Sequence, residues 1–488
     1  MSLKFVSQKA NSVELLAFFV LLLSLFQCFV MRGIQMKLLK EFLEKNRERK
    51  LKIHCVGDAM IDEYYDVKVN RISPEFPMPI MWSSDDCSIR RPGGAANVAY
   101  QFKHFNVESL LLCWCDDLGE SVFADHHISC KHALASESCN LPIKKRFLDN
   151  GIQVVRHDVE SPLCGLDENA VDAATTQTTT IIKNTSKPDV AILSDYNKGF
   201  FSSEECRILD HYRDVTTIVD PKKGPLSKWK GCTILKLNAS EASELSGKAN
   251  WEEQAKYLQN QLECEAVVIT FGGEKVCGIW NGELFNFKPD HSVKVESVVG
   301  AGDCFAAFFA MAIGHGFCVP EAAEIAWYAG SNYVKNRRNR PIVPAELDLT
   351  GIVDPADLQN RDFKLVFTNG CFDLLHEGHI KTLEFAKSKG DKLVVAINSD
   401  ASVKRLKGES RPIKPLDQRM AVMSAMKPVD FVVYFEEDTP LELIKKIKPD
   451  VLVKGQDYKS NEIVGADLVA EVFRAPIIGD LSTSNFIS

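Results

Sequence analysis

Two histidines, His376 and His379, follow an apolar run and a glycine break, and their types and spacing suit chemistry on a phosphate. The apolar run at 365–367 is typical of a buried strand, an Asn-Gly pair breaks it, and residues 379–387 have helical spacing. The histidines are therefore expected at a helix N-terminus, where backbone N–H groups and the helix dipole attract anionic oxygens. Imidazole N–H groups at that place can stabilise charge on a transferring phosphoryl group.

A second pair of motifs, far upstream, also suits phosphate chemistry. Two glycines and two alanines precede Asn97, and the sequence Gly-Ala-Gly-Asp ends at Asp303, directly before a long run of small residues at 305–316. Asp303 at a helix start can act as a general base on a hydroxyl group. The turn residues Gly300, Ala301 and Gly302 would form an anion hole for the transferred group.

Each motif also has a simpler interpretation. Two histidines beside a helix start can be a polar cap, and a glycine turn followed by an aspartate can be an N-cap. The surroundings favour the functional interpretation. Apolar strands are expected at 365–367, 393–397 and 451–453, and each is followed by a polar loop and a helix. That repetition predicts a doubly wound sheet that binds a ligand at the carboxyl ends of its strands.

Length and composition set the broad class. A chain of 488 residues is longer than one hydrophobic core usually supports, so two domains are expected. Its 45% hydrophobic and 25% charged residues are ordinary for a globular protein, and a net charge of −8 gives no reason to expect a nucleic-acid partner. The 15 cysteines are scattered and without paired spacing, which favours reduced thiols in a cytosolic protein.

The N-terminal segment 13–30 is almost wholly apolar and lies at the short edge of what spans a bilayer. Three interpretations stay open: a membrane anchor, a hydrophobic appendage, or an extension translated ahead of a start at Met31 or Met36. The enzyme bodies are expected to face the cytoplasm, because the chemistry downstream uses cytosolic nucleotides.

The motifs of the first half, Gly-Gly-x-x-Asn early and Gly-Ala-Gly-Asp late, resemble the ribokinase-like (PfkB-type) carbohydrate kinases. The resemblance implies a three-layer α/β/α domain that uses Mg²⁺ with ATP. It implies that sugar hydroxyls are held by Asp58, Asp62, Gly94 and Asn97, with Arg71, Lys145 or Arg146 at a distal phosphate. It places the nucleotide near Asn238, Glu241, Thr270, Gly272 and Gly273.

The second half resembles the cytidylyltransferase-like nucleotidyltransferases, a smaller Rossmann-like fold. No side-chain nucleophile is needed there, because a sugar phosphate itself attacks the α-phosphate of the nucleotide. The resemblance implies that His376 and His379 serve the transferring group. Its other nucleotide-binding residues would be Thr368, Asn369, Gly378, Asp400, Lys407, Arg411, Lys454, Ser482 and Thr483.

Together the two halves resemble the bifunctional enzymes of ADP-heptose synthesis. This implies a kinase acting on O1 of D-glycero-β-D-manno-heptose 7-phosphate, an adenylyltransferase acting on heptose 1-phosphate, and a homodimer. The chain departs from the family at Ser297 and Val299, which leaves open whether a monovalent cation supports the anion hole, and it ends soon after Ser482 and Thr483. Alternatives are an inactive kinase half beside a working transferase, or a membrane-tethered scaffold without activity.

The predicted boundaries follow from these motifs and from a proline-rich, acidic stretch after the kinase. They are an N-terminal extension at 1–50, a kinase domain at 51–345, a linker at 346–362 and a nucleotidyltransferase domain at 363–488.

Overall fold

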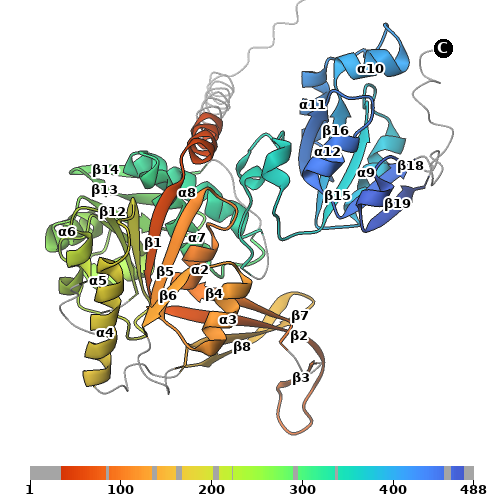
Figure 1. Cartoon of the computed structure of the whole chain (residues 1–488). Helices are drawn as coiled ribbons and strands as arrows, with labels where there is room; N and C mark the ends of the chain where they lie inside the picture. Colours follow the sequence, from red (N-terminus) through yellow and green to blue (C-terminus); the bar gives the residue numbers. More distant parts are fainter. Residues whose placement is uncertain are drawn as a thin grey trace, which may run out of the picture.

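A computed structural model describes residues 35–83, 87–133, 140–160, 168–201, 208–222, 224–289, 295–335, 339–455 and 463–476. Two α/β bodies follow each other along the chain, and a connecting segment joins them (Figure 1). The larger body contains the first half of the motifs, and the smaller body, drawn in blue, contains the second half. The predicted fold class is thereby confirmed.

The larger body is built on a nine-stranded sheet with the order β14-β13-β12-β11-β10-β9-β1-β5-β6. Strands β6 to β12 along this order are parallel, whereas β13 and β14 form an antiparallel edge. The strands are β1 (Leu51–Gly57), β5 (Val107–Trp114), β6 (Cys130–Ala133), β9 (Val190–Asp195), β10 (Thr216–Pro221), β11 (Ile234–Asn238), β12 (Ala266–Thr270), β13 (Val276–Trp280) and β14 (Glu283–Phe287).

Helices cover both faces of this sheet, because alternate strand residues point to opposite sides. In β1, Ile53 and Cys55 enter one hydrophobic core and Val56 enters the other. Helices α2 (Ala95–Tyr100), α3 (Asp117–Asp125), α7 (Ala301–Gly314) and α8 (Val319–Tyr333) pack into the first core. Helices α4 (Glu168–Lys183), α5 (Ala239–Ser246) and α6 (Trp251–Leu262) pack into the second. The result is a three-layer α/β/α body.

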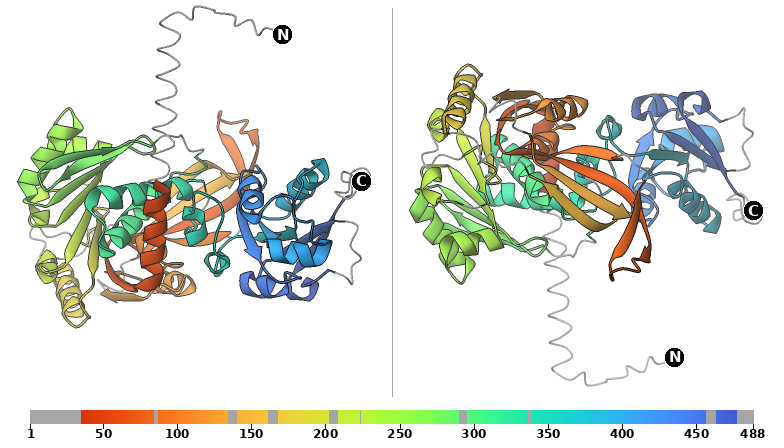
Figure 2. Two further views of the ribbon diagram at one scale, coloured as in Figure 1. Left: turned by 90° about the horizontal axis from the view of Figure 1, so that it is seen from above. Right: turned by 90° about the horizontal axis from the view of Figure 1, so that it is seen from below.

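A helix at 35–48 also packs into the first core through Leu39, Phe42 and Leu43. Its apolar residues recur at helical spacing, so one stripe is buried while the lysines and arginines face solvent. Figure 2 shows this helix, in red, against the body. The first folded unit therefore begins ahead of the predicted boundary at residue 51. Within the described ranges, no helix is long and apolar enough to cross a membrane, and the apolar segment 13–30 lies outside those ranges.

A smaller sheet projects from this body. It has the order β3-β2-β7-β8, and β4 pairs with β2. Its strands are β2 (Ala59–Ile72), β3 (Pro79–Ser83), β4 (Ile89–Gly94), β7 (Ile143–Asp149) and β8 (Ile152–Val159). Strand β2 begins beside β1 and runs outward, so the β2–β3 hairpin forms an arm that extends away from the rest of the body (Figure 1).

The smaller body has a parallel sheet with the order β17-β16-β15-β18-β19. Its strands are β15 (Leu365–Gly370), β16 (Lys392–Asn398), β17 (Phe431–Phe435), β18 (Val451–Gly455) and β19 (Glu471–Ala475). Its helices are α9 (Glu377–Lys387), α10 (Asp400–Lys407), α11 (Leu416–Ser424) and α12 (Leu441–Ile447). The chain order reverses between β15 and β18, and ligands of open α/β sheets bind at such a point.

The predicted linker 346–362 and the residues just before it are packed rather than extended in solvent. This stretch contains two 3₁₀ helices, η4 (Pro344–Leu347) and η5 (Pro355–Leu358). Ile342 and Leu347 are buried in the core of the first body, whereas Val343 and Ala345 are buried in a core of the second. Neighbouring residues of one short segment thus belong to two different cores, which sequence periodicity did not indicate.

Candidate active sites

A cavity of about 560 Å³ lies in the first body, at the carboxyl ends of its strands. Three predicted groups meet in its wall: Asp303, the anion-hole turn 300–302, and the sugar-binding candidates Asp62 and Gly94. The nucleotide candidates that also line it are Asn238, Thr270, Gly272 and Gly273. Residues separated by more than two hundred positions in the sequence are therefore brought to one cavity.

Asp303 lies in the first turn of α7 and is held by two hydrogen bonds. Asn97 donates from Nδ2 to its Oδ2 at 2.7 Å, and the Tyr196 hydroxyl donates to its Oδ1. Each carboxylate oxygen keeps a further lone pair for a substrate hydroxyl. Burial raises the pKa of Asp303, and the hydrogen bonds from Tyr196 and Asn97 offset that rise only in part.

We expect the raised pKa of Asp303 to give the kinase reaction an acidic limb. A general base must be ionised, so the rate falls as pH falls through the pKa of its carboxyl group. Because that pKa is raised, the fall is expected at a higher pH than for an exposed aspartate. A profile of kcat/KM for phosphorylation against pH measures this, and a rate that is flat down to the ordinary pKa of aspartate, about 4, would contradict it.

The anion-hole turn depends on glycine at its first position. Gly300 has a φ of 77°, which side chains rarely allow. A Cβ atom there would lie 2.4 Å from the Tyr333 hydroxyl and 2.7 Å from Asn97 Nδ2. The turn therefore packs closely against Asn97, which orients Asp303, and the N-terminus of α7 faces the cavity.

Not all predicted sugar-binding residues reach the cavity. Asn97 is fully buried and acts on Asp303 instead. Asp58 accepts the backbone N–H groups of Tyr196, Lys198 and Phe200 at 2.8–3.1 Å, so its carboxylate holds the loop that carries Tyr196. Burial raises the pKa of Asp58 to about 6. Asp58 was predicted to hold a sugar hydroxyl, whereas its carboxylate is directed toward that loop.

Of the three residues predicted to bind a distal phosphate, one lines the cavity and two do not. Arg146 lines the cavity and pairs with Asp62 at 2.7 Å. Lys145, the residue before Arg146, lies on the opposite face of β7, 4.0 Å from Glu63. Arg71 lies on the projecting arm, where its guanidinium faces the ring of Trp82, and it does not line the cavity. Because side chains alternate along a strand, Lys144 joins Arg146 at the cavity while Lys145 does not.

Glu241 lies behind the nucleotide side of the cavity. It forms a capping box with Asn238 at the start of α5, and it accepts from Lys222 Nζ at 2.9 Å. Asn238 itself lines the cavity. Glu241 therefore fixes the position of Asn238 and of a lysine that also lines the cavity, rather than facing it directly.

Sequence reasoning missed Lys236, which lies inside strand β11 and lines the cavity. Its side chain is 2% exposed, and its ammonium pairs with Asp220 at 2.8 Å and lies 3.5 Å from the Gly302 carbonyl oxygen. A lysine within an apolar strand is itself a signal, since lysine is almost never fully buried unless it is paired. Tyr196 and Lys222, which also line the cavity, were likewise not singled out.

We expect Lys236→Met to lower kcat of phosphorylation by about 10²-fold, because a buried positive charge beside the anion hole favours the phosphoryl charge that develops in the transition state. KM for the sugar should change little. Asp220 would lose its nearest cation and keep Lys222 at 3.9 Å, so the double variant Lys236→Met/Asp220→Asn controls for loss of folding. Steady-state kinetics with circular dichroism measures both effects, and an unchanged kcat in a folded variant would contradict the role.

In the second body, His376 is the N-cap of α9 and His379 follows in its first turn, as predicted. Their ring centroids are 3.9 Å apart, and the backbone N–H of His376 donates to His379 Nδ1 at 3.3 Å. The neutral His379 ring then carries its proton on Nε2, where it can donate to a phosphate. Burial, together with His376 and Lys407, lowers the pKa of His379 to about 4.

The other predicted residues of this body surround the same sheet edge. Thr368 is buried at the end of β15, and Gly378 lies in the first turn of α9. Lys454 Nζ from β18 donates to the Asn369 carbonyl oxygen at 3.3 Å. The amide oxygen of Asn369 is buried and has no hydrogen-bond partner among the described groups, so it can accept from a bound base or ribose.

Two of the predicted nucleotide-binding residues, one basic and one acidic, form ion pairs with other residues of the protein. Arg411 pairs with the buried Asp373 at 3.0 Å, and Asp400 pairs with Arg419 at 2.6 Å. Asp373 and Arg419 were not predicted as site residues. They fix the loop that carries Arg411. Ser482 and Thr483 lie outside the described residues.

The described residues contain no group of three or more histidine, cysteine or acidic side chains arranged to hold a metal ion. The described cysteines are all free thiols.

Comparison with known proteins finds a matching family for each half of the chain. A family model described as pfkB family carbohydrate kinase matches residues 202–345, and one described as cytidylyltransferase-like matches residues 367–487. The bifunctional protein HldE of Campylobacter jejuni subsp. jejuni serotype O:6 is 35% identical over 465 residues, which are 91% of this chain and 98% of that protein. HldE of Citrobacter koseri is 34% identical over 465 residues, 89% and 96% of the two chains.

Among solved structures, phosphofructokinase-2 from Escherichia coli in complex with potassium has a TM-score of 0.50 and 16% sequence identity. It covers 61% of this chain and 96% of its own, so the first body shares its fold. The identity to the HldE proteins extends over both halves and confirms the family predicted from the motifs. This chain belongs to the family of bifunctional HldE proteins, in which a PfkB-type carbohydrate kinase is joined to a cytidylyltransferase-like nucleotidyltransferase.

Proposed function

We propose that the first half transfers the γ-phosphate of ATP to O1 of D-glycero-β-D-manno-heptose 7-phosphate. The observation that carries this proposal is the meeting of Asp303, the anion-hole turn and Asp62 in one cavity. Asp303 accepts the proton of the sugar hydroxyl as its oxygen attacks the γ-phosphorus in line, and ADP leaves. The products are the 1,7-bisphosphate and ADP.

The residues around Asp303 have separate tasks in this step. Tyr196 and Asn97 hold its carboxylate in place, which keeps the attacking oxygen aligned. The N–H groups at the start of α7, together with Lys236, face the charge on the transferred group. Lys144 and Arg146 supply positive charge at the wall of the cavity near Asp62, which suits the 7-phosphate.

We propose that the second half joins heptose 1-phosphate to the α-phosphate of ATP and releases pyrophosphate, giving ADP-heptose. His376 and His379 donate hydrogen bonds to the transferring phosphoryl group from the N-terminus of α9. Lys407, near enough to His379 to lower its pKa, and Lys454 supply positive charge for the leaving pyrophosphate. The 7-phosphate must be removed by a phosphatase between the two steps.

Both reactions take ATP as its Mg²⁺ complex, so the metal arrives with the substrate. Bound Mg²⁺ neutralises phosphate charge during transfer. On the kinase side, the side-chain oxygen of Asn238, which Glu241 holds at the wall of the cavity, would lie near the metal-bound phosphates.

The experiment that tests the proposal is product analysis by mass spectrometry. Purified protein is incubated with heptose 7-phosphate and ATP, and separately with heptose 1-phosphate and each nucleoside triphosphate. We expect a bisphosphate in the first reaction and a nucleotide sugar, formed best with ATP, in the second. An absent bisphosphate would refute the kinase assignment, and an absent nucleotide sugar would refute the transferase assignment. The α- and β-anomers of the substrate, tested side by side, decide the stereochemistry.

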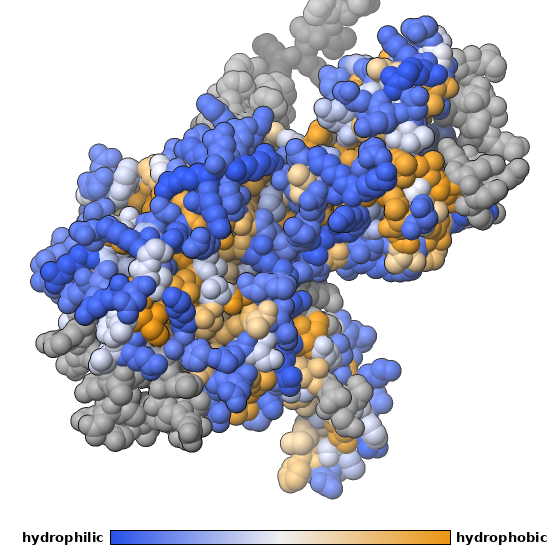
Figure 3. All heavy atoms as spheres, in the orientation of Figure 1, coloured by the Kyte–Doolittle hydropathy of each residue, from blue (hydrophilic) through white to orange (hydrophobic). Residues whose placement is uncertain are grey.

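We propose that the protein is a homodimer that pairs through the arm formed by β2 and β3. Large apolar side chains are exposed there, and Figure 3 shows hydrophobic residues gathered on this arm. They are Ile72, Phe76, Met78, Met81 and Trp82. Contiguous exposed apolar surface of this kind marks an interaction site.

We expect the double substitution Phe76→Asp/Trp82→Glu to convert the dimer into a monomer, because two charges would be buried in the interface. Light scattering after size-exclusion chromatography measures the mass. Val422→Glu, at an exposed apolar residue of α11 in the other body, is the matched control and should leave the mass unchanged. A wild-type mass equal to one chain would refute the dimer.

A further inference from the structure

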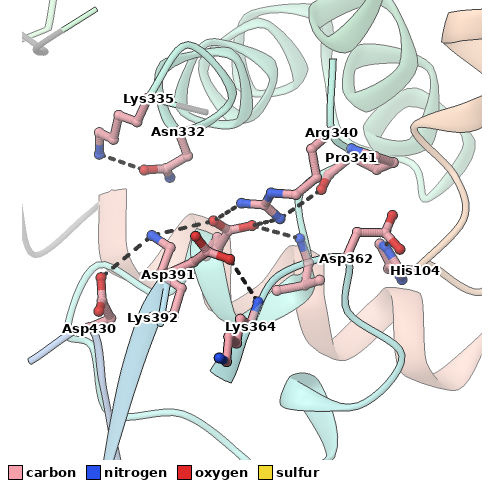
Figure 4. Close-up of polar contacts among 12 residues, drawn as sticks. His104, Asn332, Lys335, Arg340, Pro341, Asp362, Lys364, Asp391, Lys392 and Asp430 are labelled. Carbon is pink, nitrogen blue, oxygen red and sulfur yellow. Dashed lines mark hydrogen bonds and ion pairs between the residues drawn. The ribbon is translucent and has the colours of Figure 1, made fainter. Parts of the chain in front are cut away.

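A buried ion-pair network ties the kinase body to the nucleotidyltransferase body. Arg340 follows α8 and donates to both carboxylate oxygens of Glu346, at 2.7 and 3.0 Å. Glu346 Oε1 also lies 3.7 Å from Lys392 Nζ at the start of β16, and Lys392 lies 3.5 Å from Asp430. Figure 4 shows the side chains of Arg340 and Lys392 directed from the two bodies toward a carboxylate that lies between them. The Arg340 and Glu346 side chains are 9% and 6% exposed, so solvent screens this network little.

Contacts with aromatic and apolar side chains also fix the position of the segment 340–343. The Arg340 guanidinium lies 4.9 Å above the ring of Phe363, and Phe363 stacks on Phe431 of β17. Ile342 is buried in the kinase core while the next residue, Val343, is buried in the transferase core. Moving one body relative to the other would therefore pull side chains out of a core.

Asn339, directly before Arg340, contacts a residue that lines the kinase cavity, Asp62. Its Nδ2 donates to Asp62 Oδ2 at 2.8 Å, and the other oxygen of Asp62 accepts from Arg146. A Cβ atom added to Gly300 would lie 3.3 Å from Asn339 Oδ1, so Asn339 also flanks the anion-hole turn. Asn339 is 4% exposed. One residue thus touches the sugar-binding carboxylate and the phosphate-binding turn, and its neighbour in the chain is anchored by the other body.

We propose that Asn339 is a positioning residue of the kinase reaction, and that the nucleotidyltransferase body holds it in place through Arg340, Glu346 and Lys392. The inference rests on the proposed kinase function of the cavity. Asn339 orients the Asp62 carboxylate toward the sugar, so loss of the Arg340–Glu346–Lys392 network that anchors the neighbouring residue weakens sugar binding. The transferase reaction does not depend on this network, because His376 and His379 lie at the opposite, carboxyl edge of its sheet from the start of β16.

The test uses full-length variants. Asn339→Ala is expected to raise KM for heptose 7-phosphate about tenfold, since a hydrogen bond to a charged group is lost, with a smaller change in kcat. Glu346→Gln and Lys392→Met are expected to raise the same KM less. All three should keep wild-type adenylyl transfer. Arg47→Met, which breaks a 2.5 Å pair with Asp357 elsewhere in the linker, is the matched control and should leave KM unchanged.

A double-mutant cycle separates positioning from general loosening. If Glu346 acts through Asn339, the double variant Asn339→Ala/Glu346→Gln has the KM of Asn339→Ala alone. Effects that multiply, or an unchanged KM in Asn339→Ala, would overturn the inference.

Hydrogen exchange gives a second readout that needs no substrate. In Glu346→Gln and Lys392→Met, amides at 58–64 and 298–304 are expected to exchange faster than in the wild type and in Arg47→Met. Unchanged exchange at both segments would overturn the coupling. Failure of the wild-type protein to phosphorylate the sugar would instead overturn the proposed function, so the two outcomes are distinguishable.

Discussion

Asp303→Asn is expected to lower kcat of sugar phosphorylation by about 10³-fold while adenylyl transfer by the same preparation keeps its wild-type rate. The amide has the shape of the carboxyl group but cannot accept a proton at neutral pH. It keeps an oxygen for one of the hydrogen bonds that Tyr196 and Asn97 donate. Loss of rate would therefore report loss of the base, not of the cavity.

Thermal unfolding provides the control for this variant. Burial disfavours the ionised form of Asp303, as its raised pKa indicates, so a neutral asparagine removes that cost. The melting temperature is expected to stay the same or to rise. A variant that phosphorylates heptose 7-phosphate within tenfold of the wild-type rate, about 1.4 kcal/mol of barrier, would exclude Asp303 as the general base.

His379→Ala is expected to lower kcat of adenylyl transfer by about 10²–10³-fold and to leave the kinase reaction unchanged. The ring supplies a hydrogen-bond donor at the N-terminus of α9, where charge develops on the transferring group. Alanine removes the donor without disturbing the buried face of the helix, which is formed by Leu383 and Ala386. Rapid-quench measurement of pyrophosphate release reports the chemical step.

Two further measurements sharpen this prediction. His379→Gln keeps a donor of similar reach and is expected to recover part of the rate. The pKa of His379 is lowered to about 4, so the ring is neutral at pH 7 and gains a proton only as pH falls through that value. The value of kcat/KM, which reports ionisations of the free enzyme, should therefore not change through protonation of His379 between about pH 6 and 8. Wild-type activity in His379→Ala, or a titration near pH 6.5 that this substitution removes, would contradict the assignment.

The elements around both sites could be predicted because their signals are local. Strands β15, β16 and β18 were each expected from short apolar runs, and the helix N-termini at Asp303 and His379 from the glycines and polar residues before them. The three-layer and Rossmann-like architectures follow from alternation of strands and helices. Local geometry dictates such patterns, so they are readable in a single sequence.

The orientation of polar side chains could not be predicted in the same way. Asp58 and Asp62 are four residues apart near the start of β2, yet Asp58 caps a loop of the main sheet and Asp62 faces the cavity. Which of Lys144, Lys145 and Arg146 reaches the cavity depends on which face of β7 is covered. A register shift of one residue would exchange them, and only the packed sheet fixes the register.

The sequence by itself determined that this chain contains two helix starts of a type suited to phosphate, on two α/β sheets, because glycine turns, helix caps and strand alternation are properties of neighbouring residues. Only the tertiary structure decided which polar groups meet. Lys236 donates to the Gly302 carbonyl oxygen, Asn97 donates to Asp303, and Asn339 donates to Asp62. These pairs are 66, 206 and 277 positions apart. Their contact depends on burial, where an unpaired polar group is costly, and burial is settled only when the whole fold closes around them.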